Sequence, residues 1–184
     1  DVYKRQIDKC AELLPEHFRF VKGVVDSDNL SLNISRELLQ HDKQLRVIAQ
    51  NIEKRIKREL KKMMEDEPET YGKFYKLFGL QLKYGVVSDF GAHRELLSDL
   101  LMFATAKSDK LVTLEEYCNA MPEEQKYIYY ACGESLAKVS ALPQIERLRA
   151  KDFDVLYMTD EEDEFGNLKR LGDEAERSPK SYRL

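Results

Sequence analysis

Residues 127–158 read YIYYACGESLAKVSALPQIERLRAKDFDVLYM, and this stretch decides the fold class. Two runs within it, 127–131 and 153–158, are rich in the aromatic and β-branched residues that strands prefer. Residues 135–142 and 143–150, which lie between these runs, carry helical patterns. A strand, two helices and a second strand in this order predict a right-handed crossover with parallel strands. The sequence therefore predicts an α/β unit near the C-terminal end.

The turn after the first of these strands, Gly133-Glu134-Ser135, has two interpretations. It lies between a strand and a helix, as phosphate-binding loops do. It lacks the additional glycines of dinucleotide-binding and Walker A loops, which favours Ser135 as an ordinary N-cap. Upstream, Thr113 and Glu116 have the spacing of a capping box, which predicts a short helix that begins there.

A long amphipathic helix is predicted for about 42–66. Its apolar residues recur at spacings of three and four, at Leu45, Ile48, Ile52, Ile56, Leu60 and Met63. Asp42 is a candidate cap, and Pro68 favours an end just before it. Six cations lie between Lys54 and Lys62, with one acid among them. Such a stripe can contact phosphates, but the absence of aromatic residues favours a solvated face.

A helical cluster follows. Its aromatic stripe consists of Tyr71, Phe74, Tyr75 and Phe78, and Gly85 is expected to end that helix. Core packing is the favoured role of the stripe, ahead of ligand binding. Apolar residues between 96 and 103 predict a further amphipathic segment. His93 lies near its start without a second His or Cys at metal-binding spacing, which favours a surface or capping role.

Composition restricts the class of protein. The 184 residues are 42% hydrophobic and 35% charged, and the net charge of −4 argues against a dedicated nucleic-acid binder. Cys10, Cys118 and Cys132 are widely spaced without a CxxC pair, so we expect reduced thiols and a cytoplasmic protein. The sequence has no apolar run of membrane-spanning length and no signal-peptide pattern.

The candidate functional residues are Arg36 and Gln40, at the end of the segment 24–40. An apolar pair, a polar turn and alternating apolar residues precede Arg36. Because Gln40 follows four residues later, the two side chains share a face if this piece is helical. From the local pattern alone, Arg36 is either a surface residue of a first helical turn or a cation that reaches a phosphate.

Several long segments of the sequence resemble the middle domain of the heat-shock protein 90 chaperones, and the bacterial type most of all. They are FVKGVVDS at 20–27, LNISRE at 32–37 with Gln40, residues 45–56, MP at 121–122, QKYIYY at 125–130, GES at 133–135, FDVLYMTD at 153–160 and DEF at 163–165. The resemblance covers about 7–170. The chain departs from it at Ser31, where many relatives carry Pro, and Ser leaves the loop more freedom.

The resemblance implies a function that the chain does not complete alone. Arg36 matches the arginine that contacts the γ-phosphate of ATP when domains dock, Gln40 matches the glutamine of the same loop, and 24–40 matches the catalytic loop. ATP with Mg²⁺ would be bound mainly by an N-terminal domain that is absent here, and a C-terminal domain would form a homodimer. The implied partners are these two domains and unfolded client proteins, in protein folding and the stress response, without nucleic acid or membrane.

The sequence contains no self-contained catalytic motif, so the chain alone is not expected to be active, although the parent protein is expected to be an ATPase. The predicted fold is α/β and mostly helical: a long connecting helix and a small helical bundle, then a three-layer α/β/α unit with a short parallel sheet. The expected divisions are 1–6 (foreign or truncated), 7–66 (end of a large subdomain), 67–104 (helical bundle), 105–171 (α/β/α subdomain) and 172–184 (disordered tail). The alternative function is a non-catalytic helical scaffold for protein–protein interaction.

Overall fold

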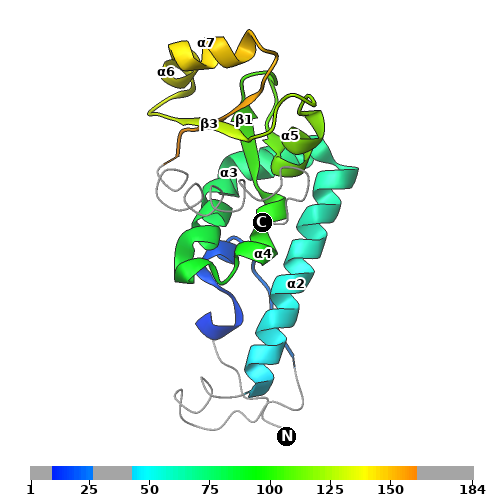
Figure 1. Ribbon diagram of the computed structural model, residues 1–184. Coiled ribbons are helices and arrows are strands. Elements are labelled where there is room, and N and C mark those ends of the chain that lie inside the picture. The colour runs from blue at the N-terminus through cyan, green and yellow to red at the C-terminus, as the bar shows by residue number, and fades with distance from the viewer. Residues whose placement is uncertain (1–9, 27–42, 161–184) are drawn as a thin grey trace, which may run out of the picture.

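Long helices form the first part of the molecule, and a small sheet with short helices forms the second (Figure 1). The computed structural model describes residues 10–26 and 43–160. The α-helices are α2 (Lys43–Asp66), α3 (Pro68–Val87), α4 (Arg94–Leu97), α5 (Leu114–Ala120), α6 (Leu136–Ser140) and α7 (Pro143–Arg149). The strands are β1 (Met102–Thr105), β2 (Val112–Thr113), β3 (Tyr129–Cys132) and β4 (Val155–Met158). Short 3-10 helices complete this part: η1 (Ala11–Leu13), η2 (Glu16–Phe18), η3 (Ser88–Gly91) and η4 (Ser98–Leu100).

The four strands form one mixed sheet in the order β2-β1-β4-β3. β3 and β4 are parallel, with Tyr129 opposite Val155 and Cys132 opposite Met158. The helices α6 and α7 connect them, which confirms the parallel pair and the two crossover helices predicted from 127–158. β1 is antiparallel to β4 on one side and to β2 on the other. The predicted fold class is thereby confirmed, with an antiparallel half that the sequence pattern did not reveal.

Alternate residues of β4 face two different layers, because successive side chains of a strand point to opposite faces of a sheet. Val155 and Tyr157 pack with Val139 of α6 and Ile145 of α7. Leu156 and Met158 belong instead to the larger core, together with α5 and the long helices. All four residues of β4 are buried, as expected for a strand covered on both faces. This arrangement gives the three-layer α/β/α unit.

The prediction of one amphipathic segment over 96–103 is wrong at its C-terminal end. Helical structure ends at Leu100, and β1 begins at Met102. Burial alternates along β1, where Phe103 and Thr105 are buried and their neighbours are half-buried. A short apolar run fits both the helical and the strand period, so pairing with β2 and β4 decides the outcome here.

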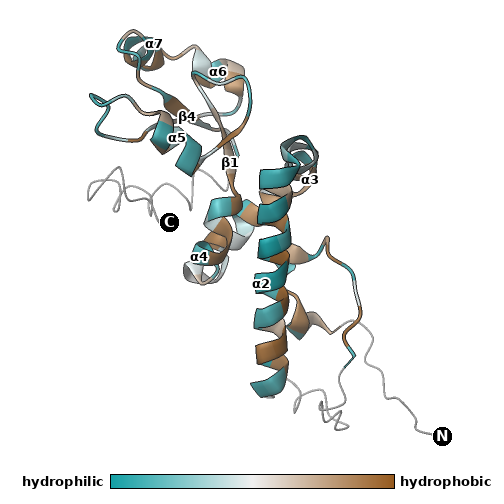
Figure 2. Cartoon of the chain, turned by 90° about the vertical axis from the view of Figure 1, so that its right-hand side faces the viewer, coloured by the Kyte–Doolittle hydropathy of each residue, from teal (hydrophilic) through white to brown (hydrophobic). Residues whose placement is uncertain are grey.

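The core of the helical part lies between α2, α3 and the elements around α4. Tyr71 and Tyr75 of α3 are buried there, and the Tyr71 hydroxyl donates a hydrogen bond to the Leu100 carbonyl. The aromatic stripe therefore serves the core, as predicted. α2 contributes Leu45 and Leu60 as buried residues, and hydrophilic residues dominate much of its outer side (Figure 2).

Gly85 lies inside α3, so the prediction that it ends the helix is wrong. The helix continues to Val87, and the backbone N–H of the C-cap residue Ser88 donates a hydrogen bond to the Tyr84 carbonyl. A Cβ atom at position 85 would lie 2.6 Å from Cγ of His17 and 2.6 Å from Cδ1 of Leu97. This glycine therefore permits close packing of η2 and α4 against α3.

Candidate functional site

The described chain that leads into the segment 24–40 is fixed against α3. Phe18 is fully buried, and its ring meets that of Phe20 edge-on with centroids 6.1 Å apart. The Phe20 ring in turn lies 5.2 Å from that of Phe74 and 4.9 Å from that of Phe78. After this anchor the chain leaves the core, since the side chain of Val24 is fully exposed.

Arg36 and Gln40 lie outside the described residues, as do most of 24–40, Ser31 and the candidate cap Asp42. The structure therefore gives the base from which that segment starts and no geometry for its two candidate side chains. The roles of Arg36 and Gln40 stay predictions.

The basic stripe of α2 is partly paired with acids. Nε of Arg55 lies 2.8 Å from Oε1 of Glu59, one turn later on an exposed face. Nζ of Lys57 lies 3.0 Å from Oδ2 of Asp99, and Nζ of Lys61 lies 3.7 Å from the same oxygen. Burial alone would raise the pKa of Asp99, but Lys57 and Lys61 outweigh it and lower that pKa. Lys57 and Lys61 thus neutralise a local acid at η4.

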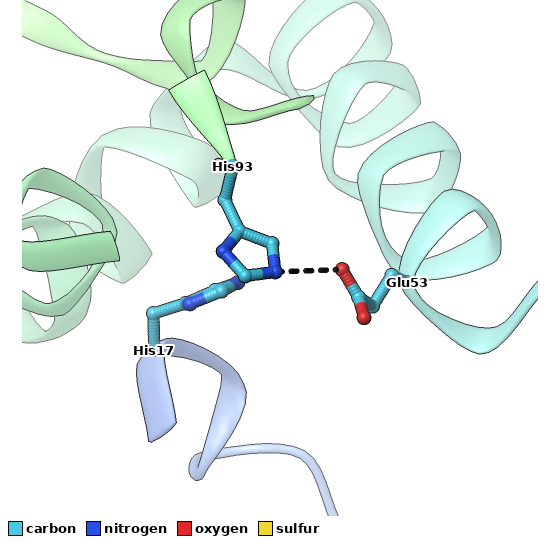
Figure 3. A group of neighbouring side chains, drawn as sticks. All are labelled: His17, Glu53 and His93. Atoms are coloured by element: carbon cyan, nitrogen blue, oxygen red, sulfur yellow. Dashed lines mark ion pairs between the residues drawn. The ribbon is translucent and has the colours of Figure 1, made fainter. Parts of the chain in front are cut away.

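Three side chains from distant parts of the sequence meet beside α2: His17 of η2, Glu53 of α2 and His93, the N-cap residue of α4 (Figure 3). One potential ligand atom from each lies within 4.8 Å of the others. Nε2 of His93 lies 3.5 Å from Oε2 of Glu53, and the two imidazole rings meet edge to face with centroids 4.7 Å apart. Such a set of two imidazoles and a carboxylate can bind a metal ion.

The sequence interpretation of His93 is incomplete, because the structure supplies the second histidine and a carboxylate. His93 does occupy the predicted capping position, but its side chain makes no capping hydrogen bond. His17 is buried, and Glu53 and His93 are half-buried. Burial raises the pKa of Glu53, while His93 acts to lower it. No local spacing links positions 17, 53 and 93, so only the packing of η2, α2 and α4 reveals the cluster.

Residues of the crossover turn have structural roles. The Ser135 hydroxyl accepts a hydrogen bond from the Lys138 backbone N–H at 3.3 Å, which confirms its N-cap role. A Cβ atom at Gly133 would lie 2.7 Å from Cγ2 of Val139, so this glycine allows α6 to approach the end of β3. The Thr113–Glu116 capping box is likewise confirmed, with hydrogen bonds in both directions at the start of α5.

A buried hydrogen-bond network joins α5 to the beginnings of β3 and β4. Nε2 of Gln125 donates to the Tyr117 hydroxyl at 2.9 Å and to the Tyr127 carbonyl at 3.1 Å. The Tyr117 hydroxyl donates to the Asp154 carbonyl at 2.7 Å, and the Asp154 N–H donates to Oε1 of Gln125 at 3.0 Å. Burial raises the pKa of Tyr117, so its hydroxyl remains protonated as a donor. No local pattern in the sequence indicates this network.

Comparisons with known proteins identify the relatives of the chain. The family model described as Hsp90 protein matches residues 3–173. Over 175 residues, or 95% of the chain, it is 56% identical to "Chaperone protein HtpG" of Clostridium botulinum (strain 657 / Type Ba4) and 54% identical to that of Bacillus subtilis (strain 168). The protein of the same name from Oceanobacillus iheyensis is 57% identical over 159 residues, or 86% of the chain.

The chain spans 28% of the length of the Clostridium and Bacillus relatives and 25% of that of the Oceanobacillus one. Within the described residues, every helix is too short or too polar to cross a membrane. The match to the Hsp90 model covers nearly the whole sequence, and the identity to chaperone proteins extends over the same range. The chain therefore belongs to the Hsp90 family of chaperones.

Proposed function

We propose that this chain is the middle segment of an ATP-dependent chaperone and that it supplies Arg36 to the γ-phosphate of ATP. The observation that carries the proposal is the family match over residues 3–173, which includes the segment 24–40. Arg36 and Gln40 are both present there, in the segment that resembles the family's catalytic loop. The proposed activity belongs to the whole protein, of which this chain is a part.

The chemistry needs a cation of this kind. A transferred phosphoryl group spreads negative charge over its oxygens, and the planar guanidinium of an arginine can contact two of them. If the arginine comes from a second domain, hydrolysis depends on domain closure, and ATP turnover can then drive a chaperone cycle. The anchoring of Phe18 and Phe20 on α3 supports the proposal, because it gives the segment 24–40 a fixed starting point.

The proposal includes the partners and compartment that the family resemblance implies. ATP with Mg²⁺ is bound mainly by an N-terminal domain outside this chain, and a C-terminal domain makes the full-length protein a homodimer. Non-native client proteins bind to the assembled chaperone in the cytoplasm, where it assists folding under stress. We expect the chain alone neither to bind nor to hydrolyse ATP, and calorimetry with Mg-ATP tests that expectation.

A scaffold function without catalysis is the second candidate, and one feature of α3 favours it. Leu77, Leu80 and Tyr84 recur at spacings of three and four, and their side chains are 73%, 52% and 48% exposed. They form an exposed apolar stripe on one side of the helix, of the kind that can contact another protein. The role of Arg36 distinguishes the two candidate functions.

The decisive experiment is Arg36→Ala in the full-length protein. We expect steady-state ATP turnover to fall by roughly tenfold or more. In other phosphoryl-transfer enzymes, a supplied arginine raises turnover by a factor of about 10³ or more. ATP affinity should change little, because the contact is made mainly in the transition state of the closed protein. ATPase rates and nucleotide-binding titrations on the same preparations measure both quantities.

Three further variants control this experiment. Arg36→Lys should restore little turnover, because an ammonium lacks the planar fork. Gln40→Ala should slow turnover less than Arg36→Ala does, because it removes a neutral hydrogen-bonding group. Arg55→Ala removes a cation that pairs with Glu59 on the exposed face of α2 and should leave turnover unchanged. Wild-type turnover in Arg36→Ala would favour the scaffold function.

A further inference from the structure

The cluster of His17, Glu53 and His93 has the composition of a zinc-binding set. Zinc in proteins is bound by imidazole nitrogens and carboxylate oxygens, and sites with three protein ligands leave a fourth position for water. The three residues come from η2, α2 and α4, so an ion bound by all of them would connect three elements. Neither the family match nor the proposed role of Arg36 requires such an ion.

The distance between Nε2 of His93 and Oε2 of Glu53 is close to the distance between two ligand atoms of one zinc ion. Nε2 of His93 and Oε2 of Glu53 are 3.5 Å apart, which exceeds the range of about 2.7–3.2 Å for a good N–H···O hydrogen bond. Two ligand atoms on a tetrahedral zinc ion, each about 2.0–2.1 Å from the metal, lie roughly 3.3 Å from one another. The potential ligand atoms of all three residues lie within 4.8 Å of one another, so closing the set around one ion requires rotations of the half-buried Glu53 and His93 side chains.

One ring nitrogen of His93, Nε2, faces Glu53 (Figure 3). The other ring nitrogen, Nδ1, is buried and has no hydrogen-bond partner among the described residues. An imidazole that binds an ion through Nε2 carries its proton on Nδ1. Nε2 is therefore the nitrogen of His93 that can bind an ion shared with Glu53.

The surrounding packing fixes the position of His17, and a long helix supports Glu53. His17 is 3% exposed, its ring contacts that of Phe18, and it lies against Gly85 where no larger residue fits. Glu53 comes from the middle of α2, a helix of 24 residues. Rigid supporting elements favour metal binding because little conformational entropy is lost when the ion enters.

The charge balance around the cluster also favours a cation. Two neutral imidazoles and one carboxylate carry a single negative charge. Lys57, one helical turn after Glu53, is engaged elsewhere: it donates to the Glu95 carbonyl at 3.1 Å and pairs with Asp99. A divalent ion would compensate the half-buried carboxylate of Glu53, whose desolvation otherwise costs free energy.

We infer that His17, Glu53 and His93 bind one zinc-like divalent cation, with water at the remaining position. The ion joins η2 to α2 and α4, and it thereby fastens the stretch of chain that precedes the segment 24–40. Binding to the folded state alone stabilises that state in proportion to the logarithm of the metal concentration. Mg²⁺ is disfavoured at this site, because it prefers oxygen ligands in octahedral geometry.

Metal titration of the full 184-residue chain tests this inference. The chain is stripped with a chelator, its thiols are removed by the substitutions Cys10→Ser, Cys118→Ser and Cys132→Ser, and folding is checked by circular dichroism. ZnCl₂ in calorimetry should show one site per chain and should raise the thermal midpoint, while MgCl₂ should do neither. CoCl₂ should give the intense visible absorption of a tetrahedral cobalt site, which MgCl₂ cannot mimic.

Variants locate the ion. Glu53→Gln and His93→Gln nearly preserve side-chain size, and each should weaken zinc binding by at least about tenfold, the lower end of the losses seen even for outer-shell partners. His41→Gln changes the remaining histidine of the chain and should leave the affinity unchanged. His17→Asn tests the buried ligand where circular dichroism shows that the variant folds. Absence of zinc binding, or zinc binding unaffected by both Glu53→Gln and His93→Gln, would overturn the inference.

Discussion

Two polar clusters lie inside this molecule, and they differ in how completely their hydrogen bonds are formed. In the sheet unit, Gln125 and Tyr117 make several hydrogen bonds of 2.7–3.4 Å that connect α5, β3 and β4. In the helical part, His93 and Glu53 face one another at 3.5 Å, and Nδ1 of His93 has no partner among the described residues. The first cluster stabilises the fold, whereas the second offers atoms to a ligand.

Removal of Tyr117 from the hydrogen-bonded cluster with Gln125 should lower the stability of the protein most. Its side chain is 1% exposed, so Tyr117→Ala leaves a cavity and removes every hydrogen bond of the hydroxyl. We expect the free energy of unfolding to fall by about 3–5 kcal/mol, the range for large aromatic residues in cores. Urea unfolding measures it. The control Tyr130→Ala changes a half-exposed tyrosine of β3 and should cost under about 1 kcal/mol.

A smaller loss should follow from Gln125→Leu, which keeps most of the side-chain volume. The buried Asp154 N–H then loses the acceptor that lies 3.0 Å away, and the Tyr117 hydroxyl and the Tyr127 carbonyl lose a donor. A buried polar group without a partner costs roughly 1–3 kcal/mol, and we expect a loss in this range by urea unfolding. Gln144→Leu, at an exposed position of α7, is the matched control. Equal stability of the two variants would mean that the network contributes nothing measurable.

Sequence periodicity was sufficient for the parts of the fold in which the pattern is long. α2 ends at Asp66, as its spacing and Pro68 predicted, and the parallel strands around α6 and α7 lie close to their predicted positions. β1 was missed because four residues after an apolar helical turn cannot be assigned from period alone. Gly85 was misassigned because its reason, the approach of His17, is a tertiary contact.

The candidate sites also differ in how far the sequence alone predicts them. Arg36 and Gln40 were identified only through resemblance, and they lie outside the described residues, as do the boundaries expected near 6 and 172. The divisions at 66 and 104, like the roles of Arg36 and Gln40, stay predictions. The cluster at His17, Glu53 and His93 could not be predicted from the sequence, because its members come from three elements whose packing determines their approach. Exposed apolar residues on α3 also required the structure, since periodicity does not show which face is covered.

The smallest expected effect contrasts Glu53 with Asp99, two carboxylates whose pKa values move in opposite directions. Burial raises the pKa of Glu53, so its contribution to folding is most favourable below its unfolded pKa of about 4.3 and is lost as pH rises through the raised value. Burial opposes ionisation of Asp99 as well, but Lys57 and Lys61 lower its pKa. The contribution of Asp99 is therefore present above its unfolded pKa of about 3.9 and is lost as pH falls through the lowered value.

In metal-free protein at pH 7, Glu53→Gln should leave the free energy of unfolding equal to or slightly above that of the wild type. Asp99→Asn should lower it by under about 1 kcal/mol, because the Asp99 ion pairs are partly solvated. Urea unfolding with a chelator at pH 7 and near pH 4 measures both variants, and the deficit of Asp99→Asn should shrink at the lower pH. If Glu53→Gln instead destabilises the metal-free protein more than Asp99→Asn does, Glu53 already has a strong partner, and the contrast between the two polar clusters is wrong.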